Sequence, residues 1–130
     1  MNITVEELKQ LAKDSYQIID IRDEVEIAHG EIPGAIACKQ DEIIGNGQID
    51  FTKELIICCS RGRFSVDVAE ELQAQGFRAR SLTGGYVAWL LDLMKEEEAK
   101  DFAKDVEYSI RKKFKKTIWS KFTKAINTYE

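Results

Sequence analysis

The sequence lacks several features that mark particular classes of protein. It has one proline and eight glycines in 130 residues, too few for a long disordered region. No stretch of about 18 residues is apolar throughout, so no membrane-spanning helix is predicted. The first ten residues have neither the basic start nor the apolar core of a signal peptide. The apolar fraction of 44% is instead normal for one compact domain with a core.

Histidine and cysteine are also scarce. One histidine and three cysteines, with no Cys-x-x-Cys spacing, argue against a zinc site, and we expect no metal and no other cofactor. An odd cysteine count with two cysteines adjacent is a poor disulfide framework. We therefore predict a cytoplasmic protein with free thiols and no membrane partner.

The net charge of −4 hides an asymmetry along the chain. Residues 1–94 hold nine basic and sixteen acidic residues, whereas residues 95–130 hold ten basic and seven acidic ones. Residues 109–124 include seven basic residues and no acidic one. This change of sign predicts a domain over residues 1–94 and a separate extension over residues 95–130.

Short apolar runs alternate with helical patterns before residue 94. Strands are predicted at 16–22, 54–59 and 77–82, with a further short strand that follows a turn at Pro33-Gly34 within residues 32–38. Helices are predicted at 5–13, 23–30, 66–75 and from Gly84 onward. We expect a capping box from Thr4 to Glu7, a helix cap at Ser65, and a helix end at Gly76. The alternation predicts an α/β fold with a mainly parallel sheet flanked by helices, whose ligands bind at the carboxyl ends of the strands.

Cys59 ends the most apolar of these strands, just before a predicted helix. A thiolate is the reactive form of cysteine, and a helix N-terminus and nearby cations favour it over the thiol. Arg61 and Arg63 add positive charge and are predicted to contact an anion, while Gly62 permits the backbone angles of a tight loop. The pattern predicts a nucleophile inside an anion-binding loop, with no separate general base.

The other thiols and the histidine are interpreted as structural. Cys58 precedes Cys59 by one residue, so its side chain is expected on the opposite face of the strand, in the core. Cys38 is also predicted to pack in the core. His29 is expected at a helix end.

Two stretches carry a resemblance to a known family. "CCSRGRFSVDVAEELQAQGF", followed by "LTGGYVAWL", resembles the rhodanese-like sulfurtransferase domain, and the upstream "IIDIRDEVEIAHGEIPGAI" resembles that family's other signature. The resemblance covers residues 3–92, approximately. It implies a five-stranded, mainly parallel sheet flanked by helices. It also implies that Cys59 carries sulfane sulfur as a persulfide, taken from thiosulfate, another small donor or a cysteine desulfurase.

The resemblance also implies roles for the neighbours of Cys59. Asp20 and Arg22, with Ser65, are expected to support the site. The substrate-binding loop is expected to consist of Ser60, Arg61, Gly62, Arg63 and Phe64. The family often has His where Glu31 stands, and usually Arg, Thr or Ser where Phe64 stands, which leaves the substrate open.

Two other functions remain open at this point. Dual-specificity phosphatases also place a cysteine in a loop that binds an anion, but their loop is one residue longer and ends in an Arg. A non-catalytic protein-binding module would keep the fold, but such relatives generally lose the cysteine.

The extension has its own pattern. An apolar residue recurs every four positions from Val106 to Ile126, which predicts a basic amphipathic helix over residues 95–129. "SIRKKFKKTIWSKFTKAINTYE" resembles the segment that precedes the phosphate-binding loop of tRNA 2-thiocytidine synthases of the PP-loop ATPase type. That loop does not follow before Glu130. We expect a linker to a downstream ATPase domain, with tRNA thiolation as the use of the sulfur, or else a helix that packs on a neighbouring domain.

Overall fold

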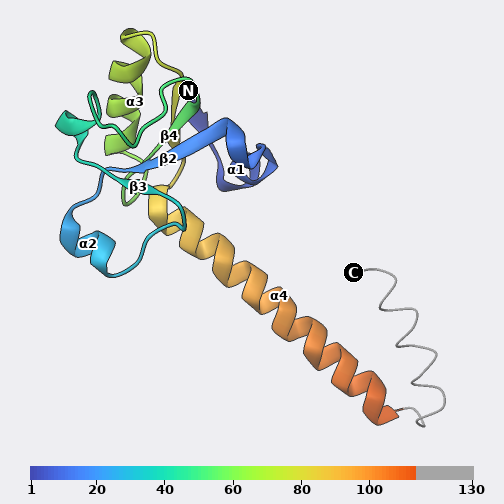
Figure 1. The fold of residues 1–130 in the computed structure, drawn as a ribbon. Coiled ribbons are helices and arrows are strands. Elements are labelled where there is room, and N and C mark those ends of the chain that lie inside the picture. The colour runs from blue at the N-terminus through green and yellow to red at the C-terminus, as the bar shows by residue number, and fades with distance from the viewer. Residues whose placement is uncertain (114–130) are drawn as a thin grey trace. The chain divides into compact units, whose positions relative to one another are not determined.

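The structure is a computed structural model that describes residues 1–113. Its centre is a five-stranded sheet with the order β1-β5-β4-β2-β3, in which every pair of neighbouring strands is parallel (Figure 1). The strands are β1 (Asn2–Ile3), β2 (Tyr16–Asp20), β3 (Ile36–Ala37), β4 (Glu54–Cys58) and β5 (Ala79–Leu82). The helices are α1 (Val5–Gln10), α2 (Glu24–Ala28), α3 (Phe64–Ala74) and α4 (Gly85–Lys113), with short 3-10 helices at Lys13–Ser15 and Gln40–Glu42. The predicted α/β fold, a five-stranded parallel sheet flanked by helices, is confirmed.

The central strand β4 sends its side chains alternately into two hydrophobic clusters. Leu55 and Ile57 pack with the buried face of α3, formed by Val68, Ala69 and Leu72. Ile56 and Cys58 face the other side, where they pack with Val5 and Leu8 of α1 and with the first turns of α4. Because both faces of the sheet are covered, every position of this strand beyond its first residue is buried and apolar.

The N-terminal region differs from the prediction in two ways. Asn2 and Ile3 form β1, which pairs with Ser81 and Leu82 of β5, whereas no strand was predicted there. The first helix ends at Gln10 rather than residue 13, because Leu11 takes an extended conformation. The predicted capping box is confirmed, since Thr4 and Glu7 each accept a hydrogen bond from the other's backbone N–H.

The start of α3 corrects the prediction for Ser65. The helix begins at Phe64, two residues before the first position that a cap at Ser65 would allow, and Arg63 stands at the N-cap without a side-chain hydrogen bond. Ser65 lies inside the first turn and is fully buried. Its hydroxyl has buried partners described below instead of the free N–H groups of the helix. The helix ends before Gly76, as predicted, with Gly76 at a φ of 93°.

The chain forms two compact units, Met1–Asp92 and Leu93–Glu130. Helix α4 begins in the first unit and continues in the second as far as Lys113. Much of the basic amphipathic helix predicted over residues 95–129, and of the segment that resembles part of a tRNA-thiolating ATPase, falls in residues 114–130, outside the described residues. Within residues 1–113, none of the helices combines the length and the apolar character that crossing a membrane requires.

Candidate active site

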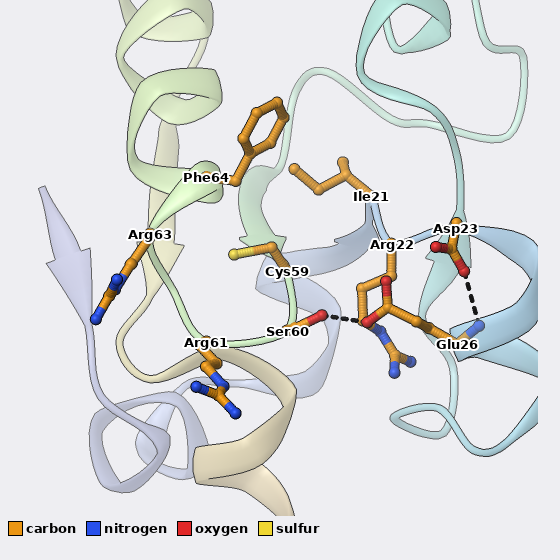
Figure 2. Close-up of a pocket in the computed structure, with 9 residues that line it drawn as sticks. All are labelled: Ile21, Arg22, Asp23, Glu26, Cys59, Ser60, Arg61, Arg63 and Phe64. Carbon is orange, nitrogen blue, oxygen red and sulfur yellow. Dashed lines mark hydrogen bonds between the residues drawn. The ribbon is translucent and has the colours of Figure 1, made fainter.

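The candidate site lies at the carboxyl ends of three neighbouring strands, β2, β4 and β5. Asp20 and Cys58 are paired in register at the ends of β2 and β4, so the segments that follow them start side by side. A cavity of about 330 Å³ opens there (Figure 2). Its lining residues are Ile21, Arg22, Asp23, Glu26, Cys59, Ser60, Arg61, Arg63 and Phe64.

The sulfur of Cys59 sits among hydrogen-bond donors at the floor of this cavity. The backbone N–H of Gly62 lies 3.1 Å from the sulfur, and the backbone N–H of Ser65 lies 3.4 Å from it. The Ser65 hydroxyl is 3.2 Å away. Gly62 has a φ of 80°, a conformation that side chains disfavour and that lets the loop turn around the sulfur.

These contacts favour the thiolate form of Cys59. Burial by itself raises the pKa of the thiol, because the charged form loses contact with water. Hydrogen bonds from the Ser65 hydroxyl and from the N–H groups of Ser65, Gly62 and Arg61 outweigh burial, and the pKa falls below its usual value. The N-terminus of α3 points at the same place and adds to this effect. The arrangement therefore makes a reactive nucleophile without a neighbouring base.

The loop is oriented by α4, which binds its carbonyl groups from outside. The backbone N–H of Tyr86 donates to the Cys59 carbonyl at 2.9 Å, and that of Val87 donates to the Ser60 carbonyl at 3.1 Å. Gly85 makes this approach feasible, because a Cβ there would lie 2.3 Å from the Cys59 carbonyl oxygen. With the carbonyls held outside, the N–H groups of the loop face the sulfur.

A second serine, which the sequence did not single out, stands behind Ser65. Ser81 of β5 is 1% exposed, and its hydroxyl oxygen lies 2.6 Å from that of Ser65. When Cys59 is a thiolate, Ser65 donates to the sulfur and accepts from Ser81. The only signal in the sequence was a serine next to the last, apolar residue of a predicted strand, and it did not reveal the partner.

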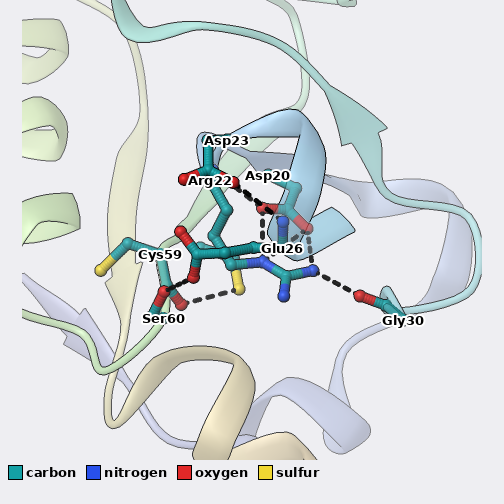
Figure 3. A network of polar contacts seen from close by, with 8 residues as sticks. Asp20, Arg22, Asp23, Glu26, Gly30, Cys59 and Ser60 are labelled. Carbon is teal, nitrogen blue, oxygen red and sulfur yellow. Dashed lines mark hydrogen bonds and ion pairs between the residues drawn. The ribbon is translucent and has the colours of Figure 1, made fainter. Parts of the chain in front are cut away.

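Asp20 and Arg22 form a buried pair beside the site (Figure 3). The Asp20 carboxylate accepts from Nε and Nη2 of Arg22 and from the Arg22 backbone N–H, at distances of 2.8 to 3.2 Å. Nη2 also donates to the Gly30 carbonyl, and the guanidinium lies 3.9 Å from the centre of the Tyr86 ring. The pair thus ties the segment after β2 to the start of α4, and its supporting role for the site stays a prediction.

Cys58 and Cys38 occupy the places predicted for packing. Cys58 is fully buried on the side of β4 opposite to Cys59, and burial is the main cause that raises its pKa to about 12. Cys38 is also buried, and its sulfur accepts from the Asn46 side chain at 3.3 Å. Among the described residues, no three His, Cys, Asp or Glu side chains are grouped so that they could hold a metal ion.

The two arginines of the loop line the cavity but do not enter it. Both side chains are exposed, and Figure 2 shows their guanidinium groups turned away from the Cys59 sulfur. Only the backbone N–H of Arg61 acts on the thiol. Contact of Arg61 and Arg63 with a bound anion stays a prediction.

The segment after β2 contributes two carboxylates to the cavity that were not predicted. The Ser60 hydroxyl donates to the Glu26 carboxylate, so this charge is held beside the residue that follows the nucleophile. Asp23 accepts from the Glu26 backbone N–H at 2.8 Å and caps α2. Ile21 and Phe64 supply the apolar part of the lining. An aspartate in a cap position before a short helix was visible in the sequence, but its distance from Cys59 in the chain hid the shared cavity.

Comparisons with known proteins agree with this geometry. The model of the rhodanese-like domain family matches residues 4–92, which include Cys59 and the Asp20–Arg22 pair. The thiosulfate sulfurtransferase GlpE of Shewanella oneidensis is 35% identical over 91 residues, which cover 68% of this chain and 90% of that protein. A tRNA sulfurtransferase of Desulfurococcus amylolyticus is 32% identical over 90 residues, which cover 69% of this chain but 18% of that protein. The crystal structure of a rhodanese-like domain protein from Staphylococcus aureus has a TM-score of 0.60 at 36% identity, covering 68% of this chain and 91% of that one.

Proposed function

The chain belongs to the family of rhodanese-like domains, and we propose from this premise that it is a sulfurtransferase whose Cys59 carries sulfane sulfur as a persulfide. The observation that carries the proposal is the Cys59 sulfur itself. It is ringed by the N–H groups of Gly62 and Ser65 and the Ser65 hydroxyl, and it faces a cavity that a small donor can enter.

The proposed transfer has two halves. In the first, the Cys59 thiolate attacks the outer sulfur of a donor, the donor's S–S bond breaks, and the leaving group departs with the electron pair of that bond. In the second, a nucleophilic acceptor attacks the outer sulfur of the Cys59 persulfide, and the Cys59 thiolate leaves. Neither half requires an outside oxidant or reductant, because each exchanges one bond to sulfur for another. The N–H groups around the sulfur stabilise the negative charge of the Cys59 thiolate, both when it attacks the donor and when it leaves after transfer to the acceptor.

The two rival functions fit the site less well. Phosphoryl transfer needs cations that bind the transferred oxygens, and the loop here ends in Phe64, with the Arg61 and Arg63 guanidinium groups turned away. A binding module has no use for a buried thiol held by several donors with a lowered pKa. Sulfur transfer is the function that uses every one of these features.

The test is the intact mass of the protein after incubation with a sulfur donor. Thiosulfate and a cysteine desulfurase with cysteine are used in separate reactions on the wild type, Cys59→Ser and Cys58→Ser. We expect the wild type and Cys58→Ser to gain one sulfur atom that a reductant removes, and Cys59→Ser to gain none. A wild type that gains no sulfur from any donor would refute the proposal.

For the acceptor, we propose an enzyme that thiolates tRNA. Support comes from the tRNA sulfurtransferase that contains a matching region and from the resemblance of the C-terminal segment to part of a tRNA-thiolating ATPase. The test incubates protein loaded with labelled sulfur with a PP-loop tRNA-thiolating ATPase, ATP and unmodified tRNA. We expect labelled thionucleoside in the tRNA, and none with Cys59→Ser. Loaded Cys59 without labelled tRNA would reject this acceptor and leave the carrier function intact.

A further inference from the structure

The lining of the cavity points to a class of sulfur donor. We infer that the donor is an organic persulfide, R–S–SH, that carries little negative charge, and that Glu26 and Phe64 select it over the thiosulfate dianion. This inference rests on the proposed function, and it concerns the same site. The donor is named by its chemistry, and it can be the persulfide of a small thiol or of a cysteine on another protein.

The first ground is that, among the described residues that line the cavity, no cation is aimed at its floor. Thiosulfate brings two negative charges to a thiolate, so its approach needs positive groups to offset the repulsion. Arg22 lines the cavity, but its guanidinium already binds the Asp20 carboxylate. The Arg61 and Arg63 guanidinium groups point away from the sulfur. The N–H groups of Gly62 and Ser65 are already engaged by the sulfur of Cys59.

The second ground is the negative charge that lines the cavity. Glu26 accepts a hydrogen bond from Ser60, which fixes its carboxylate at the wall next to Cys59. Asp23 lines the same wall and is held there as the cap of α2. Carboxylates placed in this way repel a dianion and attract a donor that carries an ammonium group.

The third ground is the apolar part of the cavity lining. Phe64 and Ile21 both line the cavity, and Figure 2 shows their side chains on the same side of the Cys59 sulfur. Phe64 is 59% exposed, so its ring is open to a molecule that enters the cavity. The carbon chain of an organic persulfide can cover this ring, whereas thiosulfate has no apolar part.

The transfer from such a donor balances without a further reactant. The Cys59 thiolate attacks the terminal sulfur of R–S–SH, a bond forms between the two sulfurs, and the S–S bond of the donor breaks. The donor leaves as the thiolate R–S⁻ with the electron pair of that bond, and Cys59 holds –S–SH. The charge stays at one unit throughout. With thiosulfate, three negative charges would have to meet in the cavity.

The experiment measures the initial rate at which donors load Cys59, followed by intact mass. The small donors are thiosulfate and the hydropersulfides of cysteamine and of 3-mercaptopropionic acid, which are similar in size and opposite in charge. A persulfide-loaded cysteine desulfurase is the protein arm. The variants are Glu26→Gln and Phe64→Arg. Their matched controls are Glu24→Gln on the same helix and Phe102→Arg, a ring that is 70% exposed and lies outside the cavity lining.

For the wild type we expect the cysteamine persulfide to be fastest and thiosulfate slowest, by about tenfold or more. Glu26→Gln should reduce the ratio between the loading rates of the two hydropersulfides by about fivefold, and Phe64→Arg should raise the loading rate with thiosulfate. Both controls should keep the wild-type order. If the protein donor loads Cys59 faster, the source is a protein persulfide; if the small donors load it faster, the source is the persulfide of a small thiol.

Two results would overturn the inference and leave the proposed function standing. One is a wild type that thiosulfate loads as fast as the organic persulfides. The other is an unchanged set of ratios between the loading rates of the donors in both Glu26→Gln and Phe64→Arg. Failure of every donor to load the wild type would instead reject the proposed function, and this inference with it.

Discussion

The hydroxyl oxygens of Ser65 and Ser81 lie 2.6 Å apart, and that of Ser65 also lies 3.2 Å from the Cys59 sulfur. Both serines are buried, one in the first turn of α3 and the other in β5. Ser81 therefore orients the hydroxyl that Ser65 offers to the sulfur, and the strand next to β4 contributes to the reactivity of the nucleophile.

Ser65→Ala is expected to raise the pKa of Cys59, because it removes the side-chain hydrogen bond that favours the thiolate. The rate of alkylation of Cys59 by iodoacetamide should rise at a higher pH than in the wild type, and at neutral pH it should be about fivefold slower. Peptide mapping at each pH gives the rate for Cys59 alone. Ser15→Ala, which removes an exposed hydroxyl bonded to a local carbonyl, serves as the control. An unchanged profile in Ser65→Ala would contradict the role of this hydroxyl.

The raised pKa of Cys58 allows a prediction of how the stability of the protein changes in alkaline solution. Its pKa is raised to about 12 in the folded protein, whereas the ordinary value is 9.0. The folded protein thus keeps Cys58 as a neutral thiol while the unfolded chain ionises. The stability that this difference contributes is full below pH 9 and is lost as the pH rises toward 12. The free energy of unfolding should fall by about 1.4 kcal/mol per pH unit in that window from this group alone.

The measurement compares urea unfolding of the wild type and Cys58→Ala between pH 8 and about 11. Cys58→Ala should be less stable at pH 8 because it leaves a space in the core, but its stability should decline less steeply with pH. Parallel curves of stability against pH for the two proteins would show that the pKa of Cys58 does not differ between the folded and unfolded states.

Gly85→Ala is expected to disrupt the site through the backbone. The added Cβ would lie 2.3 Å from the Cys59 carbonyl oxygen, and the φ of 60° disfavours a side chain. We expect a loss of more than about 3 kcal/mol in the free energy of unfolding, or failure to fold. Gly76→Ala is the matched control, because its φ is also positive but a Cβ there would meet no atom within 4 Å. It should cost about 1 kcal/mol, and equal losses in the two variants would argue against close packing at Gly85.

Asp20→Asn is expected to destabilise the protein by about 3–5 kcal/mol, because it leaves the buried guanidinium of Arg22 without its counter-charge. Glu54→Gln breaks the ion pair with Arg80, whose side chains are 20% and 29% exposed, and should cost less than about 1 kcal/mol. Chemical unfolding at pH 7 measures both. A small loss in Asp20→Asn would mean that Arg22 is held by Gly30 and Tyr86 without the carboxylate.

The parts of the fold that sequence could predict are those written in local patterns. β4 was visible as a continuous apolar run, and α3 was visible as an apolar pattern with helical spacing. Cys59 stood out because it lies at the end of the first and before the polar loop that leads to the second. β1 was missed because two residues are too few for any periodicity, and because its pairing with β5 joins opposite ends of the domain. Ser65 was mistaken for a cap because the sulfur of Cys59, rather than the side chain of an N-cap residue, accepts a hydrogen bond from the backbone N–H of Ser65 at the start of α3.

The candidate site was predictable to a similar extent. The loop from Cys59 to Phe64 was found because it is continuous in sequence, and Asp20 and Arg22 were found through a family signature. Glu26 and Ser81 were not, because only the packing of α2 and β5 brings them to the loop. The direction of the Arg61 and Arg63 side chains depends on how the loop turns, which their position in the sequence does not determine.

The loop around Cys59 owes its shape to backbone contacts with α4, and its exposed side chains take no part in them. Arg61, Arg63 and Phe64 can therefore be exchanged while the N–H groups still surround the sulfur. The backbone N–H groups set the reactivity of the sulfur, whereas the exposed side chains form the surface that a partner would meet. A lineage that carries this scaffold can therefore vary these three surface positions without rebuilding the loop that surrounds the sulfur.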